Sequence, residues 1–128
     1  MLVYHGTSRE HADRFIRDGI DADRLHTRAI HGPQDFEPGL FVTPRFDVAR
    51  RFGLCVLQIE VELDELVVPP ALRIAGATLK GVLTHPFEPQ ALLVTRVSPC
   101  RVTLIESHSN EYPFNPFDET IPPQGVQR

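Results

Sequence analysis

The first segment whose residue types could bind a ligand is Tyr4-His5-Gly6-Thr7. A histidine at the end of a short apolar run can donate or accept a hydrogen bond. The glycine that follows has no side chain, so its backbone N–H and C=O can approach a ligand closely. His5 is therefore a candidate ligand contact. A histidine that merely ends a strand or fills the edge of a core fits the same pattern.

A second segment combines glycine with aromatic residues. Residues 39–44 read Gly-Leu-Phe-Val-Thr-Pro, and Phe46, Ala49 and Phe52 follow at spacings that fit a short helix. Phe41 and Phe52 could enclose a flat ring between their aromatic faces. They fit equally a hydrophobic strand that packs its helix onto the core. Each segment alone has these two explanations, and their combination favours a binding site.

Other kinds of catalytic site find little support. The remaining histidines have no spacing typical of a zinc site: His11, His26, His31, His85 and His108. No glycine-rich phosphate loop and no Gly-x-Ser-x-Gly turn is present. Cys55 and Cys100 lie in apolar, strand-like runs, which favours buried structural thiols over a nucleophile. A single disulfide between them stays open, but nothing indicates a disulfide framework.

The composition limits the class of protein. A chain of 128 residues, 41% of them hydrophobic, suffices for one domain with a modest core. The net charge of −4 and pI of about 5.8 argue against a nucleic-acid binder that depends on phosphate neutralisation. Arg45, Arg50 and Arg51 form either a local basic patch or, more commonly, a solvated helix face. We find no signal-peptide pattern and no apolar run near the about 20 residues of a membrane span, so a cytoplasmic protein without membrane contact is expected.

The elements expected at the start of the chain place His5 at a strand end. A strand over residues 2–5 stops at Gly6, and residues 7–10, Thr-Ser-Arg-Glu, supply a capping-box pattern with Thr7 as the cap. Apolar residues at helical spacing continue to Gly19, which suits the position after a helix end. Residues 21–38 are interpreted as a long connection with a functional role.

The elements expected further along place the aromatic residues. A strand over 39–42 leads into a short helix with Thr43 as N-cap and proline at the first helical position, and Gly53 ends it. The clearest strand covers 54–63, with alternate residues from Cys55 on one face. A weak helix over 72–83 and strands over 91–97 and 101–106 follow. Short strands and few helices predict an α+β domain over 1–106 on a mixed or antiparallel sheet, with a proline-rich tail or strap over 107–128.

Together, the two segments resemble the ADP-ribosyltransferase superfamily, in the branch that includes poly(ADP-ribose) polymerases and the small bacterial rifampicin-modifying transferases. His5-Gly6-Thr7 matches the family's strand that ends in His-Gly-Thr or His-Gly-Ser. Residues 39–42, and the helix that ends at Phe52, match its Gly-x-Tyr-Phe strand and following helix. The likeness covers residues 2–63 well and 84–106 loosely. It implies a single ADP-ribosyltransferase-like domain with a split sheet.

The resemblance implies that the chain uses NAD as a co-substrate. His5 would hydrogen-bond a hydroxyl of the nicotinamide ribose. The Gly6 backbone would hold the carboxamide through one N–H and one C=O. Phe41 and Phe52 would stack on the nicotinamide ring, with Phe41 in place of the family's usual tyrosine. Thr7 is a candidate for an additional hydrogen bond.

The third element of the family is a glutamate (in some branches an aspartate) that opens a late strand and grips the ribose 2′-hydroxyl. The matching region here is residues 87–94. If the strand starts at Ala91, the position falls on Gln90, and Glu88 lies two residues earlier on the same strand face. Three outcomes are open: Glu88 supplies the carboxylate, Gln90 supports slower transfer without the electrostatic contribution, or the domain only binds.

The expected function is mono-ADP-ribosyl transfer from NAD to an unidentified acceptor, with release of nicotinamide. Chain elongation is not expected, because the family ties it to the glutamate whose position reads here as Gln90. The acceptor would be a protein, a nucleic acid or a small molecule, and a role as toxin, effector or modifying enzyme rests on analogy alone. The alternatives are a catalytically silent NAD- or ADP-ribose-binding module, an NAD-dependent RNA 2′-phosphotransferase, and an interaction domain that only keeps the fold.

Overall fold

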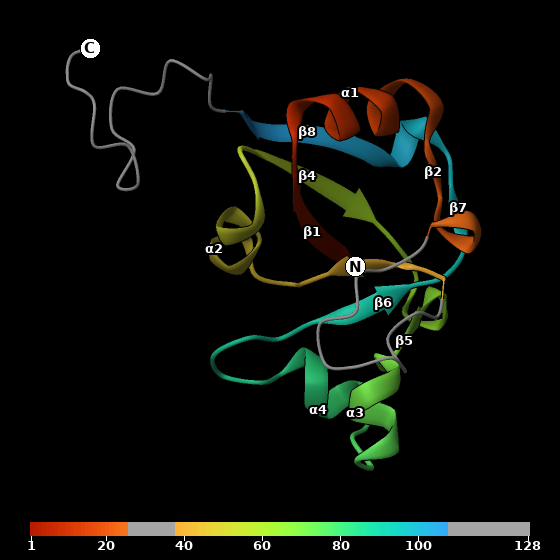
Figure 1. Cartoon of the computed structure of the whole chain (residues 1–128), viewed down its shortest axis with the longest axis vertical. Helices are drawn as coiled ribbons and strands as arrows, with labels where there is room; N and C mark the ends of the chain where they lie inside the picture. The colour runs from red at the N-terminus through yellow and green to blue at the C-terminus, as the bar shows by residue number, and fades with distance from the viewer. Residues whose placement is uncertain (26–37, 108–128) are drawn as a thin grey trace, which may run out of the picture.

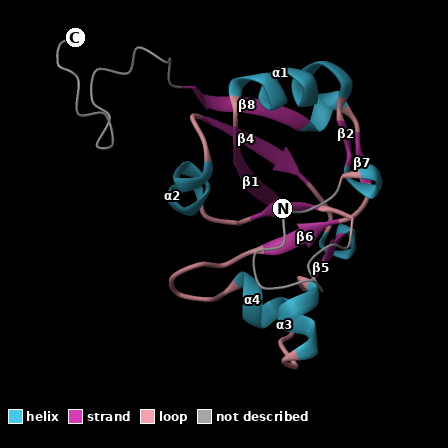
Figure 2. Cartoon of the chain, viewed as in Figure 1, coloured by secondary structure: helices cyan, strands magenta, loops and turns pink. Residues whose placement is uncertain are grey.

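The computed structural model describes residues 1–25 and 38–107 and arranges them in short strands and helices (Figure 1, Figure 2). The strands are β1 (Leu2–Thr7), β2 (Ile20–Asp21), β3 (Leu40–Val42), β4 (Cys55–Glu60), β5 (Leu66–Val67), β6 (Ala91–Leu93), β7 (Arg96–Val97) and β8 (Val102–Ser107). The α-helices are α1 (Arg9–Asp18), α2 (Phe46–Ala49), α3 (Pro70–Ile74) and α4 (Leu79–Leu83). Short 3-10 turns are η1 (Ala22–Arg24), η3 (Arg50–Phe52), η4 (Leu63–Glu65) and η5 (Pro99–Arg101).

The described strands form two three-stranded sheets and a two-stranded ribbon, all antiparallel. β4 lies between β1 and β8 in one sheet, β6 lies between β3 and β5 in the other, and β2 pairs with β7. The sheets meet where Tyr4 of β1 exchanges backbone hydrogen bonds of 2.7 and 3.0 Å with Thr43, just after β3. This arrangement confirms the α+β class with antiparallel sheets and few helices.

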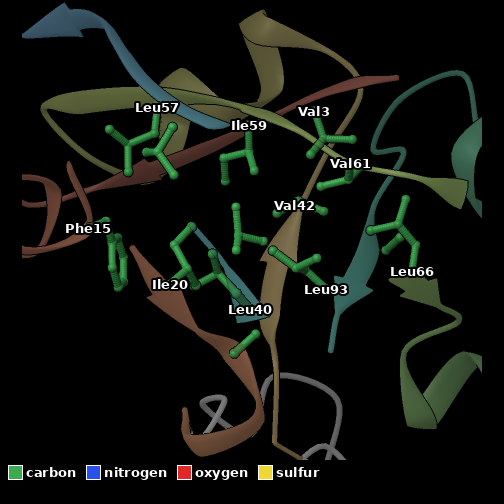
Figure 3. Close-up of a cluster of buried hydrophobic side chains, with 14 of the residues drawn as sticks. Val3, Phe15, Ile20, Leu40, Val42, Leu57, Ile59, Val61, Leu66 and Leu93 are labelled. Atoms are coloured by element: carbon green, nitrogen blue, oxygen red, sulfur yellow. The ribbon is translucent and has the colours of Figure 1, made fainter. Parts of the chain in front are cut away.

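The core lies between the two sheets and holds β1 and β3 in place. Leu57 and Ile59 of β4 point toward Leu40, Val42 and Leu93 of the second sheet (Figure 3). Burying an aliphatic side chain of this size contributes about 1.5–3 kcal/mol relative to leaving it exposed. The strands that carry His5 and Phe41 are therefore supported from the core side of the sheets.

Strand β1 and helix α1 differ from expectation in one respect that matters for the site. β1 does not stop at Gly6, because its pairing with β4 continues to Thr7 opposite Cys55. The expectation that Thr7 caps the helix is wrong: Ser8 is the N-cap, and its Oγ accepts a hydrogen bond from the His11 N–H at 3.2 Å. Thr7 is a buried strand residue.

Helix α2 also begins later than predicted. Its N-cap is Arg45, because Thr43 is held in the bridge to Tyr4, and Pro44 precedes the helix. The helical segment continues from α2 through η3, and Gly53 ends it, as expected. The segment that carries Phe52 is therefore two short turns.

The later elements are shorter than predicted. β4 ends at Glu60 rather than at residue 63, and Leu63 is exposed in η4. The helix expected over 72–83 is divided into α3 and α4, with Gly76 at a φ of 89° between them. The strand expected over 91–97 is divided into β6 and β7. The connection over 21–38 and the tail from 107 lie mostly outside the described residues, although Ser107 ends β8 and residues 20–24 form β2 and η1.

Candidate functional site

A cavity of about 710 Å³ is lined by residues of β1, β3, α1, the segment from α2 to η3 and the chain leading into β6. Its volume is within the about 300–1,000 Å³ typical of small-molecule and cofactor sites. The residues predicted to contact NAD all line it: His5, Gly6, Thr7, Phe41, Phe52, Glu88 and Gln90. Three segments far apart in the sequence thus meet at one cavity.

His5 presents a hydrogen-bond acceptor rather than a charge. Its Nδ1 lies 2.8 Å from the Phe41 carbonyl oxygen, and because a carbonyl only accepts, Nδ1 carries the proton and donates. Burial lowers the pKa of His5 to about 4, against the raising effect of this hydrogen bond, and the charge of His11 lowers it further. The ring is neutral at pH 7, which leaves Nε2 as an unprotonated acceptor suited to a hydroxyl group.

The backbone of Gly6 faces the cavity side of β1. The N–H and C=O of Tyr4 bond to Thr43 on the edge of β1 opposite β4. Backbone groups two positions apart in an antiparallel strand point to the same side, so those of Gly6 also point away from β4. The bridge to Thr43 does not extend to Gly6, and none of the described residues outside β4 bonds to its backbone. Gly6 therefore offers an adjacent donor and acceptor, the pair that a primary amide complements.

Position 6 also requires glycine for packing. A Cβ atom there would lie 1.9 Å from the carbonyl oxygen of Ala49 and 3.3 Å from Cβ of Phe52. The segment from α2 to η3 therefore rests directly on the β1 backbone. A larger residue would push this segment, and with it Phe52, away from the cavity.

Phe41 and Phe52 both line the cavity. Phe41 is half-buried in β3, between the buried Leu40 and Val42. Phe52 is 64% exposed, which is unfavourable for so large an apolar ring. Among the described residues neither ring packs against another aromatic ring. Both are therefore available to a flat ligand, at about 0.5–1.5 kcal/mol for each stacking contact beyond burial of area.

Glu88 and Gln90 both line the cavity, on either side of the fully buried Pro89. Gln90 directly precedes β6, is half-buried, and donates its backbone N–H to the Val82 carbonyl at 3.2 Å. Glu88 lies at the rim, and its carboxylate is 3.9 Å from the Arg51 guanidinium with 61% of its side chain exposed. The residue next to β6, Gln90, is thus neutral, and Glu88, which carries the carboxylate, is the more exposed to solvent.

His11 and Arg14 also line the cavity, although the sequence patterns did not indicate them as site residues. His11 and Arg14 project from α1 into the lining, one helical turn apart. The sequence did contain a signal for their position near His5, because both residues follow His5-Gly6-Thr7 on a helix that starts directly after the strand. Their position became visible only with the direction of α1 across β1.

The arginines near the cavity do not form a basic patch. Each has a carboxylate within salt-bridge distance: Arg45 with Asp47 at 2.6 Å, Arg50 with Glu106 at 3.1 Å and Arg51 with Glu88 at 3.9 Å. Arg45 also donates to the Pro86 carbonyl at 2.7 Å, which ties α2 to the chain before β6. The charges of these three arginines are therefore balanced by nearby carboxylates.

The remaining candidates do not build a second site. Cys55 is buried but Cys100 is exposed on η5, so the expectation of two buried thiols is wrong for Cys100, and both are free. Over residues 1–25 and 38–107, no cluster of three or more His, Cys, Asp or Glu side chains could hold a metal ion. None of the helices in these ranges is long and apolar enough to cross a membrane.

Comparisons with known proteins give no family for this chain: no family model, no curated protein and no solved structure matches it. Any conclusion about function must therefore come from the chemistry of the cavity.

Proposed function

We propose that the chain binds NAD in this cavity and transfers one ADP-ribose unit to an acceptor, with release of nicotinamide. One observation carries the proposal: the paired N–H and C=O of Gly6, the acceptor Nε2 of neutral His5, and two open aromatic rings line the same cavity. An amide-bearing flat ring attached to a ribose needs these groups together. The resemblance to the ADP-ribosyltransferases supports the same assignment.

The reaction needs orientation more than acid catalysis. Nicotinamide is a pyridinium cation in NAD, so the bond between its ring nitrogen and the ribose C1′ breaks with the electron pair moving to that nitrogen. Neutral nicotinamide leaves, and the acceptor nucleophile bonds to C1′ and loses its proton. The chain would hold the carboxamide on Gly6, the ring between Phe41 and Phe52, and a ribose hydroxyl on His5. Fixing reactants in this way is a large part of catalysis.

Glu88 would stabilise the positive charge that develops on the ribose, and Gln90 would hydrogen-bond a ribose hydroxyl. Because Glu88 is solvated and paired with Arg51, its electrostatic contribution is smaller than that of a buried carboxylate. This observation favours a second candidate, a module that binds NAD without turnover. Replacing Glu88 with Gln separates the two: turnover that depends on Glu88 falls, whereas binding by a silent module is unchanged.

The proposal is tested by incubating the protein with NAD and measuring free nicotinamide by chromatography. We expect the native protein to release nicotinamide. In His5→Ala the rate of release should fall at least about tenfold, because the hydrogen bond that orients the ribose is lost. Phe52→Ala is a second variant, chosen because its exposed ring contributes little to folding. Phe87→Ala is the matched control, since Phe87 is 73% exposed and does not line the cavity.

The outcomes distinguish the candidates. An increase in melting temperature with NAD, but no nicotinamide, indicates the silent module. Neither nicotinamide release nor a change in melting temperature contradicts the proposal. Melting curves of each variant without ligand show whether a loss of activity follows from unfolding.

A further inference from the structure

The α1 wall of the cavity carries the charge that the β1 and β3 walls lack. Among the described residues that line the cavity, Arg14 is the only lysine or arginine and Glu88 is the only aspartate or glutamate. His11 lies beside Arg14 on the same wall. A ligand that fills the cavity therefore meets a cationic group on α1.

The two charges come from different elements of the cavity wall. Arg14 belongs to α1, and Glu88 belongs to the chain before β6, in which the Pro86 carbonyl accepts a hydrogen bond from Arg45. In Figure 1, α1 and the chain before β6 lie on opposite sides of β1 and β3. The cavity thus suits a ligand whose positive and negative parts are separated along its length.

The guanidinium of Arg14 is available to an anion. Its only ion pair among the described residues is with Glu10 at 3.6 Å, with 49% of the Arg14 side chain and 83% of the Glu10 side chain exposed. An exposed pair at this distance contributes little, so exchanging Glu10 for a ligand anion costs little. Arg17 on the same helix differs, because it makes two hydrogen bonds of 3.0 Å to Asp18 and does not line the cavity.

His11 is positioned through Phe15. The rings of His11 and Phe15 are stacked, with centroids 6.4 Å apart and an angle of 25° between planes, and Phe15 meets His5 edge-on at 6.1 Å. The His11 backbone N–H is already used by Ser8. The contact with Phe15 therefore links the His11 ring, on the cavity wall, to the ring of His5.

We propose that Arg14 and His11 form an anion subsite that binds the diphosphate of a dinucleotide. The inference rests on the proposed function and deepens it, because it assigns the two ends of the ligand: the diphosphate at α1 and the nicotinamide ribose near Glu88 and Gln90. Arginine binds phosphate oxygens in a forked, charge-assisted geometry, with hydrogen bonds stronger than those between neutral groups. The shared chemistry is phosphate, from a diphosphate bridge or from a single ribose 2′-phosphate.

Calorimetric titration of three ligands into the native protein, Arg14→Gln and Arg17→Gln tests the subsite. The ligands are ADP-ribose, adenosine 2′-monophosphate and nicotinamide, the last of which carries no phosphate. We expect Arg14→Gln to lower the affinity for ADP-ribose about tenfold or more, and this difference should shrink as the salt concentration rises. The affinity for nicotinamide should not change. Arg17→Gln, the same substitution on the same helix, should leave the affinities for all three ligands unchanged.

Failure of the subsite is distinguishable from failure of the proposed function. Equal affinity of native protein and Arg14→Gln for ADP-ribose overturns the subsite, whether or not nicotinamide is released from NAD. Tighter binding of adenosine 2′-monophosphate than of ADP-ribose also overturns it, and favours 2′-phosphate chemistry instead. Binding of ADP-ribose that depends on Arg14, without nicotinamide release, supports the subsite and counts against the transferase. No binding of any phosphate ligand contradicts both.

Discussion

Two polar regions of this molecule differ in how completely their hydrogen bonds are made. Around Glu65 the carboxylate accepts from Arg101 at 2.9 and 3.2 Å, from the Thr95 hydroxyl at 2.8 Å and from the Glu62 N–H at 2.8 Å. In the cavity, the Gly6 backbone pair and the Nε2 of His5 remain without a partner among the described residues. The polar groups around Glu65 therefore satisfy one another, whereas those in the cavity are left for a ligand or water.

The difference separates structural from functional polar groups. Buried polar groups are nearly always hydrogen-bonded, so unpaired ones at a cavity indicate where a ligand or water completes the bonding. The Glu65 cluster joins η4, η5 and Thr95, and none of its residues lines the cavity. Its Arg101 hydrogen bonds, followed by those of Glu62 and Thr95, lower the pKa of Glu65 to about 2 despite its burial.

The largest effect on stability is expected at Glu65. Glu65→Ala removes the carboxylate of the cluster and leaves the half-buried Arg101 guanidinium with backbone carbonyls as its remaining acceptors, so the free energy of unfolding should fall by about 2–3 kcal/mol. Urea denaturation at pH 7 measures this. Because the cluster is away from the cavity, nicotinamide release per folded molecule should stay as in the native protein.

Glu65→Gln keeps the shape of the side chain and two polar atoms. It should lose less stability than Glu65→Ala. A loss of NAD binding in folded Glu65→Gln would show that the Glu65 cluster and the cavity are coupled rather than independent.

A smaller effect, of about 1 kcal/mol, is expected from the pH dependence of His5. Its pKa is about 4 in the folded protein and near the usual 6.5 in the unfolded chain. The unfolded chain therefore binds a proton between these values that the folded protein does not, so stability falls as the pH drops from 7 to 5. The expected effect is reduced from the full shift, because the residue is only partly shielded from solvent.

His5→Asn is the matched variant, since its amide can still donate toward the Phe41 carbonyl but does not titrate. The difference in unfolding free energy between pH 7 and pH 5 should be about 1 kcal/mol smaller in His5→Asn than in the native protein. An equal pH dependence in both would mean that folding does not lower the pKa of His5, contrary to its burial beside the Phe41 carbonyl.

The sequence was sufficient for the α+β class and for the approximate positions of most strands. β4 was predictable because its inward side chains alternate along one face. The continuation of β1 through Gly6 was not, because glycine usually weakens a strand, and here tertiary pairing with β4 overrides that preference. The helix caps were each misplaced because Thr7 and Thr43 are held in strand pairing and a bridge that no local pattern reveals.

The site was predictable where it follows local motifs and not where it depends on the packing of distant elements. His5, Gly6, Phe41 and Phe52 were found from two motifs in order. The ring tautomer of His5 follows only from its contact with the Phe41 carbonyl, 36 residues away in sequence. Arg14 was missed because a helical arginine at that spacing is ordinarily a solvated side chain, and only the position of α1 gives it a cavity to line.

The most direct test of the central claim is the backbone amide of Gly6, followed by nuclear magnetic resonance in ¹⁵N-labelled protein as NAD is added. If the open donor and acceptor bind the carboxamide, the Gly6 amide proton shifts downfield in a saturable way, and free nicotinamide at high concentration moves it in the same direction. The amide of Gly76, exposed between α3 and α4, serves as the internal control and should not move. A Gly6 resonance that stays in place while NAD saturates the protein would contradict the account.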